Sequence, residues 1–149
     1  MVQFLRRLLT IFRGSARKSP HQDNVAASEQ IARYILSKKH FSVTNRTVKY
    51  GAYLPAPNGE ASVYRISNIS EKEIWDIGQE YVAGPSKRTL RARGDTAAAV
   101  ITKTGLEFVP ETTPHPLHAN IANWPLQKDE QKMLAVEMAN QAKLVTPPD

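Results

Sequence analysis

The sequence predicts an α+β fold: a small, mainly antiparallel sheet of about four strands packed with three to four helices, plus an N-terminal amphipathic helix. Three patterns lead to this prediction. Residues 47–54 and 61–67 look like strands, residues 70–84 carry a capped helical pattern, and residues 125–144 repeat apolar side chains at helical spacing. We expect a basic amphipathic helix over 1–13, a flexible linker over 14–24 and a single α+β domain over 25–146.

Residues 1–13 separate into a polar and an apolar face when they are placed on a helix. The side chains expected to dock this segment on a membrane surface or on a partner are Phe4, Leu5, Arg6, Arg7, Leu8, Leu9 and Phe12. Two other interpretations stay open. The helix packs on the domain, or the segment reflects a targeting role or a start codon placed too far upstream.

The first part of the domain is expected to be a helix followed by a hairpin. Ile31, Ala32, Ile35 and Leu36 form an apolar stripe that predicts a helix over 25–39, with Asp23 or Asn24 as its N-cap. Residues 47–54 alternate as a strand does, and the turn-rich residues 55–60 would connect them to a second strand over 61–67.

The clearest predicted element is a helix that starts at Ser70. Ser70 and Glu73 have the spacing of a capping box, and Ile69 and Ile74 occupy the positions of a hydrophobic staple. Gly84 is expected just after the helix, where Pro85 stops it.

Residues 88–110 predict a strand, a short helix and another strand. Asp95 is the expected N-cap of a helix over 97–103, and Gly105 is expected just after it. The last helix is predicted over about 125–144, with proline in its first turn and Pro147 beyond its end.

The charge of the chain narrows its function classes. The net charge is +6, but residues 1–20 hold five bases and no acid, so residues 21–149 are close to neutral. This is weak support for nucleic-acid binding, which draws affinity from phosphate neutralisation.

The chain has no cysteine, which excludes disulfides and thiolate zinc sites, and no apolar run approaches the ~18 residues of a spanning helix. The P-loop, the dinucleotide glycine motif and the common zinc and serine-hydrolase motifs are absent.

Two basic groups are candidates for binding an anion or nucleic acid. Arg91 and Arg93 point the same way on a strand, with Lys87 and Arg88 beside them, and such a pair can hold a phosphate or carboxylate. Residues 33–53 mix cations with aromatic rings and contain no acid, which suits single-stranded nucleic acid. The candidate binding set is Arg88, Arg91, Arg93, Lys38, Lys39 and Arg46. Ordinary solvated surfaces would also explain both groups.

Residues 111–125 concentrate unusual side chains. His115 and His118 are weak catalytic candidates, because imidazole titrates near neutral pH and Arg91 or Arg93 could stabilise a phosphorane. A metal site is disfavoured because Pro116 prevents a regular helix between the two histidines, and no metal or other cofactor is predicted. The structural alternative is a stiff segment anchored in the core by Ile121 and Trp124.

The run from "SEKEIW" through "RARGD" to "HANIANWP" and "EQKM" resembles short bacterial proteins, which implies a bacterial or phage origin and no chemistry. We therefore expect a small accessory or adaptor protein that binds a protein partner or nucleic acid through its basic surfaces. We expect it to be cytoplasmic, with peripheral membrane contact through residues 1–13 and no transmembrane segment. The alternative is a metal-independent ribonuclease or toxin-like enzyme that uses His115 or His118 with Arg91 and Arg93.

Overall fold

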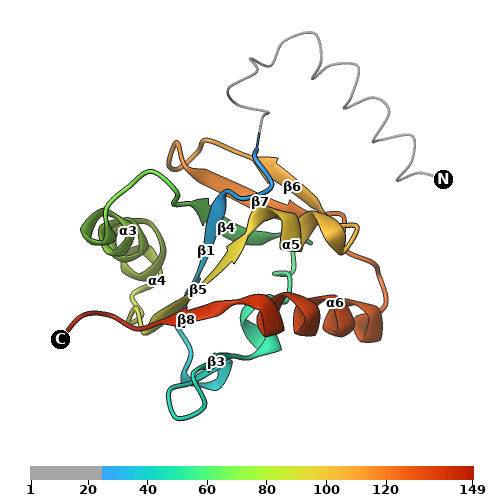
Figure 1. The fold of residues 1–149 in the computed structure, drawn as a ribbon, viewed down its shortest axis with the longest axis horizontal. Coiled ribbons are helices and arrows are strands. Elements are labelled where there is room, and N and C mark those ends of the chain that lie inside the picture. Colours follow the sequence, from blue (N-terminus) through green and yellow to red (C-terminus); the bar gives the residue numbers. More distant parts are fainter. Residues whose placement is uncertain (1–24) are drawn as a thin grey trace, which may run out of the picture.

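A six-stranded antiparallel sheet forms the centre of the molecule (Figure 1). The computed structural model describes residues 25–149, so the predicted helix over 1–13 and the linker over 14–24 lie outside the described residues. In spatial order the strands are β6 (Glu107–Pro110), β7 (His118–Ala122), β4 (Ala61–Arg65), β1 (Gln30–Ile35), β5 (Ala92–Ala97) and β8 (Lys143–Val145). The predicted mixture of helices with an antiparallel sheet is confirmed, but the sheet is larger than the four strands expected.

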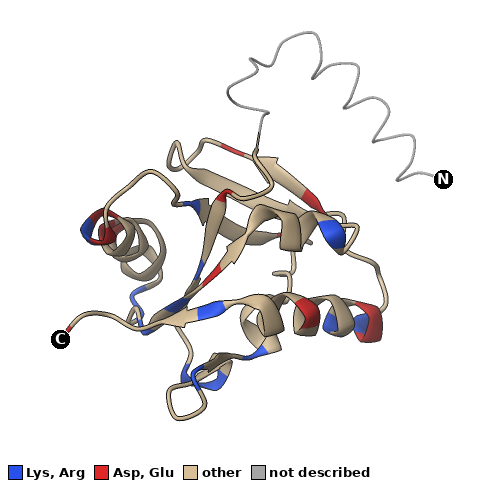
Figure 2. Ribbon diagram, in the orientation of Figure 1, with Lys and Arg blue, Asp and Glu red and all other residues tan. Residues whose placement is uncertain are grey.

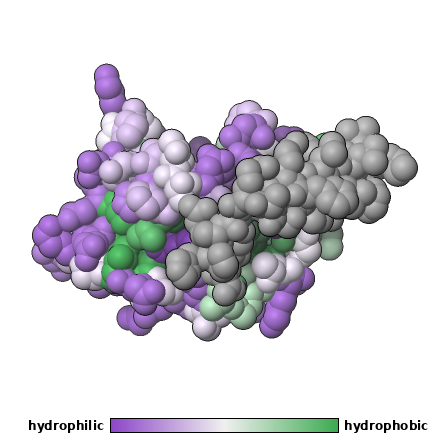
Figure 3. All heavy atoms as spheres, turned by 90° about the horizontal axis from the view of Figure 1, so that it is seen from above, coloured by the Kyte–Doolittle hydropathy of each residue, from purple (hydrophilic) through white to green (hydrophobic). Residues whose placement is uncertain are grey.

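Each face of the sheet carries its own core. On one face, Ile31, Ile35, Val63 and Ile121 pack against Met138 of α6 (Lys128–Gln141). On the other face, Ala32, Tyr34 and Tyr64 pack against Ile74 and Ile77 of α3 (Glu71–Ile77). Figure 1 accordingly shows α3 and α6 on opposite sides of the sheet. Seen from above that view, hydrophobic atoms reach the surface in patches between hydrophilic side chains (Figure 3).

The helix predicted over 25–39 is wrong, because this segment contains the inner strand β1. A strand that is buried on both faces has no apolar–polar alternation, so its apolar run can be mistaken for a helical stripe. Here Ile31 and Ile35 enter one core while Ala32 and Tyr34 enter the other. Six residue pairs, from Gln30↔Ala97 to Ile35↔Ala92, join β1 to β5.

The strand predicted over 47–54 is reduced to β3 (Thr47–Val48), which pairs with β2 (Phe41–Ser42) in a separate two-stranded sheet. Two short 3₁₀ helices, η1 (Lys38–His40) and η2 (Tyr50–Ala52), flank this pair. The predicted hairpin between 47–54 and 61–67 is therefore wrong. The second strand exists as β4, but it pairs with β1 and β7.

The helix predicted from Ser70 is confirmed with its capping box. The Ser70 Oγ accepts from the Glu73 backbone N–H at 3.2 Å, and Ile69 packs on the cluster that contains Ile74. The predicted end at Gly84 is wrong. A π-helical segment, η3 (Gly78–Ala83), continues into α4 (Gly84–Ser86), and Lys87 ends it in the left-handed region with φ 56°.

The strand, helix and strand predicted over 88–110 are present as β5, α5 (Ala98–Lys103) and β6, but Asp95 lies inside β5 and Ala97 is the N-cap. The segment 111–125 contains β7, which is an interior strand and was not predicted. Helix α6 ends at Gln141, and the chain beyond it forms the edge strand β8 instead of a longer helix.

The contact between Gly78 and Tyr34 gives a test of this packing. A Cβ atom at Gly78 would lie 2.5 Å from the Tyr34 Cε1 atom, closer than atoms can approach. We expect Gly78→Ala to lower the free energy of unfolding by about 1–3 kcal/mol, although alanine is the better helix former. Urea unfolding measures this, and Gln79→Ala at the neighbouring exposed position should have little effect. A Gly78→Ala variant as stable as the wild type would contradict the predicted clash.

Candidate functional site

The pairing of β1 with β5 brings two basic segments together at one end of the sheet. The Arg91 backbone N–H donates to the Ile35 carbonyl at 3.0 Å, and its Nε donates to the Leu36 carbonyl at 3.1 Å. Residues just after β1 therefore lie beside residues just before β5. We call this region the basic end and define it as Lys38, Lys39, His40, Lys87, Arg88 and Arg91.

The basic end is made from chain segments that contain no carboxylate. Residues 30–59 and 81–94 hold nine lysines and arginines and no aspartate or glutamate. Lys38, Lys39, Lys87 and Arg88 are exposed, and in residues 25–149 none of them forms an ion pair. Figure 2 shows the resulting gathering of basic residues around β3 and the neighbouring end of the sheet. Exposed cations without partners create a positive potential that attracts polyanions.

The positive potential of the basic end affects the pKa of His40. Burial lowers the pKa of His40 below its ordinary value of 6.5, and the charges of Arg33, Arg88 and Lys39 lower it further. A positive charge on this imidazole is disfavoured because cations from β1, from the segment before β5 and from η1 act on it together. The sequence did not show that Arg88 and His40 share one environment, because 47 positions separate them along the chain.

Two tyrosines and one arginine of the predicted 33–53 run are internal. Tyr34 and Tyr53 are buried in the two cores. The Arg33 guanidinium donates to the carbonyls of Ala52 and Ser62, both at 2.7 Å, and burial lowers its pKa. Arg33 therefore ties β1 to β4 and η2. Tyr50 is 38 % exposed, and the ammonium group of Lys132 lies 4.9 Å from the centroid of its ring.

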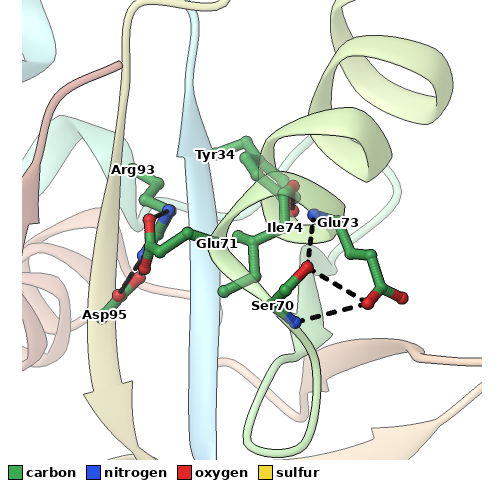
Figure 4. Close-up of polar contacts among 7 residues, drawn as sticks. All are labelled: Tyr34, Ser70, Glu71, Glu73, Ile74, Arg93 and Asp95. Atoms are coloured by element: carbon green, nitrogen blue, oxygen red, sulfur yellow. Dashed lines mark hydrogen bonds and ion pairs between the residues drawn. The ribbon is translucent and has the colours of Figure 1, made fainter. Parts of the chain in front are cut away.

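Arg93 is directed into the protein, not into the basic end. Its side chain is only 2 % exposed and forms paired hydrogen bonds with Glu71, at 2.7 and 3.0 Å, and with Asp95, at 3.0 to 3.2 Å (Figure 4). The guanidinium carbon also lies 4.9 Å from the centroid of the Trp75 ring. With its charge matched by two carboxylates, Arg93 has little capacity left to bind an external phosphate.

The pKa values of Glu71 and Asp95 shift in opposite directions because the two carboxylates differ in burial. The hydrogen bond from Arg93 lowers the pKa of Glu71, whose side chain is 68 % exposed. Burial raises the pKa of Asp95, which is 13 % exposed, although Arg93 acts in the opposite direction. The ion cluster attaches α3 to β5 and keeps a buried cation neutralised.

His115 and His118 lie several strands away from Arg93, on the same face of the sheet. His118 is on β7 and Arg93 on β5, with β4 and β1 between them, a separation of about 14 Å at the usual spacing of strands. The histidines and arginines are therefore not brought to one substrate phosphate. His118 instead contacts Ser62 and Glu111, and the ring of His115 lies against Tyr81 and Tyr64.

The sequence patterns had not indicated Ser62, Glu71, Glu111 or Trp75 as partners of the candidate residues. Each lies far along the chain from the residue it contacts, apart from Glu111, which is seven residues before His118. Only the strand register across β7 and β4, and the packing of α3 on β5, bring these groups together.

Within residues 25–149, no helix is long and apolar enough to cross a membrane. In the same residues, no three side chains of histidine, aspartate or glutamate gather in a way that could hold a metal ion. No protein-family model, curated protein or solved structure matches the chain.

The Arg93 cluster makes a prediction about stability. Arg93→Met would leave Asp95 as a buried carboxylate without its cation, and we expect a loss of about 3–5 kcal/mol in the free energy of unfolding. The double variant Arg93→Met with Asp95→Leu should recover most of that loss, because it removes the uncompensated charge as well. Chemical denaturation at neutral pH measures both variants. A loss below about 1 kcal/mol in the single variant would show that Asp95 does not depend on Arg93.

Proposed function

We propose that the protein is an accessory or adaptor module that binds nucleic acid through the basic end. The observation that carries this proposal is the gathering of exposed lysines and arginines from residues 30–59 and 81–94, without a single carboxylate in either segment. Cations that lack ion-pair partners can release the counterions of a phosphate backbone without first breaking internal contacts.

Nucleic acid fits this surface better than a single small anion does. The cations come from η1 and from the α4–β5 connection, so they offer several separate charge contacts to a repeating phosphate chain. Arg93, the residue best suited by its geometry to a paired contact with one phosphate, is already held by Glu71 and Asp95. An acidic protein partner is the alternative, and the experiment below separates the two.

The proposal includes a cytoplasmic location, where nucleic acid is accessible. It also gives residues 1–13 a role as a docking element for a protein partner or for the membrane surface. The support for that role is the basic amphipathic pattern of these residues in the sequence.

Binding to a fluorescently labelled 20-nucleotide single strand tests the proposal. We expect measurable affinity at low salt and a linear fall of log K with log salt concentration. The triple variant Lys38→Glu, Lys39→Glu and Arg88→Glu should bind more weakly, with a salt slope smaller by about 2, because about three phosphate contacts are lost.

A matched control changes the same net charge elsewhere. Lys72, Lys103 and Lys128 are exposed on α3, α5 and α6, and replacing all three by glutamate should alter binding much less. Equal losses in both triple variants would show that only net charge matters. The absence of binding at low salt, together with capture of an acidic protein that depends on Lys38, Lys39 and Arg88, would replace nucleic acid by the protein partner.

The same proposal predicts a pH dependence through His40. Bound phosphates would offset the cations that lower the pKa of His40, so its pKa would be higher in the complex than in the free protein. Binding should therefore tighten as the pH falls through the pKa of the complex, and level off below the pKa of the free protein. His40→Gln should lack this additional pH dependence. Titration of the His40 ring by NMR, with and without the oligonucleotide, gives both pKa values, and a pKa that does not rise on binding would place the nucleic acid elsewhere.

A further inference from the structure

A short chain of hydrogen bonds connects Ser62 on β4, His118 on β7 and Glu111 just after β6. The Ser62 Oγ and the His118 Nε2 are 2.7 Å apart, and the His118 Nδ1 and the Glu111 carbonyl oxygen are 2.9 Å apart. A carbonyl oxygen can only accept a hydrogen bond, so Nδ1 must carry the proton. In neutral imidazole Nε2 is then an acceptor, and the Ser62 hydroxyl donates to it.

A hydrogen bond donated in this direction, from the serine hydroxyl to the imidazole, is the one that activates a serine as a nucleophile. A neighbouring base that accepts the hydroxyl proton makes the oxygen reactive, and a third group must hold the base in the correct tautomer and orientation. Here His118 is in the position of the base, and the Glu111 carbonyl orients it. The Arg91 and Arg93 side chains take no part, so this arrangement differs from the ribonuclease that the sequence suggested.

The fold holds the histidine rigidly and leaves the serine accessible. His118 is 6 % exposed and lies in register opposite Tyr64, whose ring meets it edge-on at a centroid distance of 5.2 Å. The Glu111 backbone N–H donates to the His118 carbonyl at 3.0 Å, which also places the Glu111 carbonyl. Ser62 is partly exposed.

A hydrogen-bond donor lies beside the serine. Asn120 is directly opposite Ser62 in the pairing of β7 with β4, and on this face of the strand it lies two residues from His118. Its amide nitrogen donates to a carboxylate oxygen of Glu111 at 3.3 Å. An amide nitrogen carries two hydrogens, so a second one is available for an oxygen that becomes negatively charged.

We propose that Ser62 and His118 form a catalytic pair for acyl transfer from a small carboxylic ester. The Ser62 Oγ attacks the carbonyl carbon while its proton passes to the His118 Nε2, and Asn120 donates to the oxyanion. The tetrahedral intermediate collapses, the bond to the alcohol breaks, and His118 returns the proton to the leaving alcohol. Water then attacks the acyl–serine ester, gives one proton to His118, and releases the carboxylic acid as Ser62 regains its proton.

Aromatic rings lie on one side of the pair. The Tyr64 ring contacts His118, and the His115 ring contacts those of Tyr64 and Tyr81 edge-on, with ring centroids 6.2 and 4.9 Å apart. Aromatic rings offer an apolar wall to an acyl chain, while Ser62, His118 and Asn120 supply the polar groups. This activity is independent of nucleic-acid binding at the basic end.

Reaction of the full chain with a fluorophosphonate probe tests the proposal. The serine oxygen attacks phosphorus and fluoride leaves, so an activated serine gains a stable adduct that intact-mass measurement and peptide mapping locate. We expect one adduct, on Ser62, and none on Ser62→Ala. His118→Gln should slow labelling by about 10²-fold or more, the usual contribution of a general base. The control Gln79→Ala, at an exposed position outside the pair and its aromatic surroundings, should label at close to the wild-type rate.

Hydrolysis of p-nitrophenyl acetate provides the second measurement. We expect a release of p-nitrophenol that Ser62→Ala abolishes while its thermal unfolding stays close to that of the wild type. Wild-type protein that gains no adduct on Ser62, or hydrolyses the ester no faster than Ser62→Ala, would overturn the proposal. Both measurements use the wild type, so the proposal stays testable even if His118→Gln fails to fold. Neither depends on salt-sensitive binding of an oligonucleotide.

Discussion

The structure depends on the pairing of β1 with β5. Six consecutive residue pairs join them, and both strands lie inside the sheet, so their side chains must satisfy two cores at once. This pairing places Tyr34 beneath Gly78, where no side chain could fit, and positions Arg93 under α3. It also sets the end of β1 beside the start of β5, which brings Lys38 and Lys39 near Arg88 and Arg91. One backbone register thus arranges the core, the ion cluster and the basic end.

The arginines and lysines of this protein divide according to their chemistry. Arg33 and Arg93 are internal and use their fixed, planar guanidinium groups to bond two elements each, carbonyls in one case and carboxylates in the other. Lys38, Lys39 and Lys87 are exposed and hydrated, and they lack carboxylate partners among the described residues. The internal arginines stabilise the fold, and the exposed cations remain available to a polyanion.

The histidines follow a similar division. His40 lies among cations, whose charges add to burial in lowering its pKa. His118 lies between a serine hydroxyl and a backbone carbonyl, where its tautomer is determined by the acceptor at Nδ1. The basic end and the Ser62–His118 pair therefore rest on different physical properties, long-range charge in one case and the direction of two hydrogen bonds in the other. The proposed binding surface and the proposed catalytic pair lie at different places on the sheet, the first where β1 ends and β5 begins and the second on β4 and β7.

Local signals in the sequence were sufficient to predict those features that are stabilised by residues close together along the chain. The capping box of Ser70 and Glu73, the staple of Ile69 and Ile74, and the turn glycine Gly105 could be recognised because each acts over a few residues. The basic character of residues 33–53 was also visible, and His118 and Arg93 were candidate residues. The partners of His118 and Arg93 were not visible, because Ser62 and Glu71 are brought to them only by strand register and helix packing.

The segments that were misjudged are the ones whose structure is decided by distant contacts. The apolar run of β1 fits a helix or a doubly buried strand equally well, and only pairing with β4 and β5 selects the strand. Likewise, β7 and β8 form because open backbone hydrogen bonds at the edges of their neighbours require partners. The sequence by itself therefore determined the helix caps, the turns and the supply of charge. Tertiary structure alone decided the strand order, and with it which cations face solvent and which side chains meet, because hydrogen bonds between strands join residues regardless of their separation along the chain.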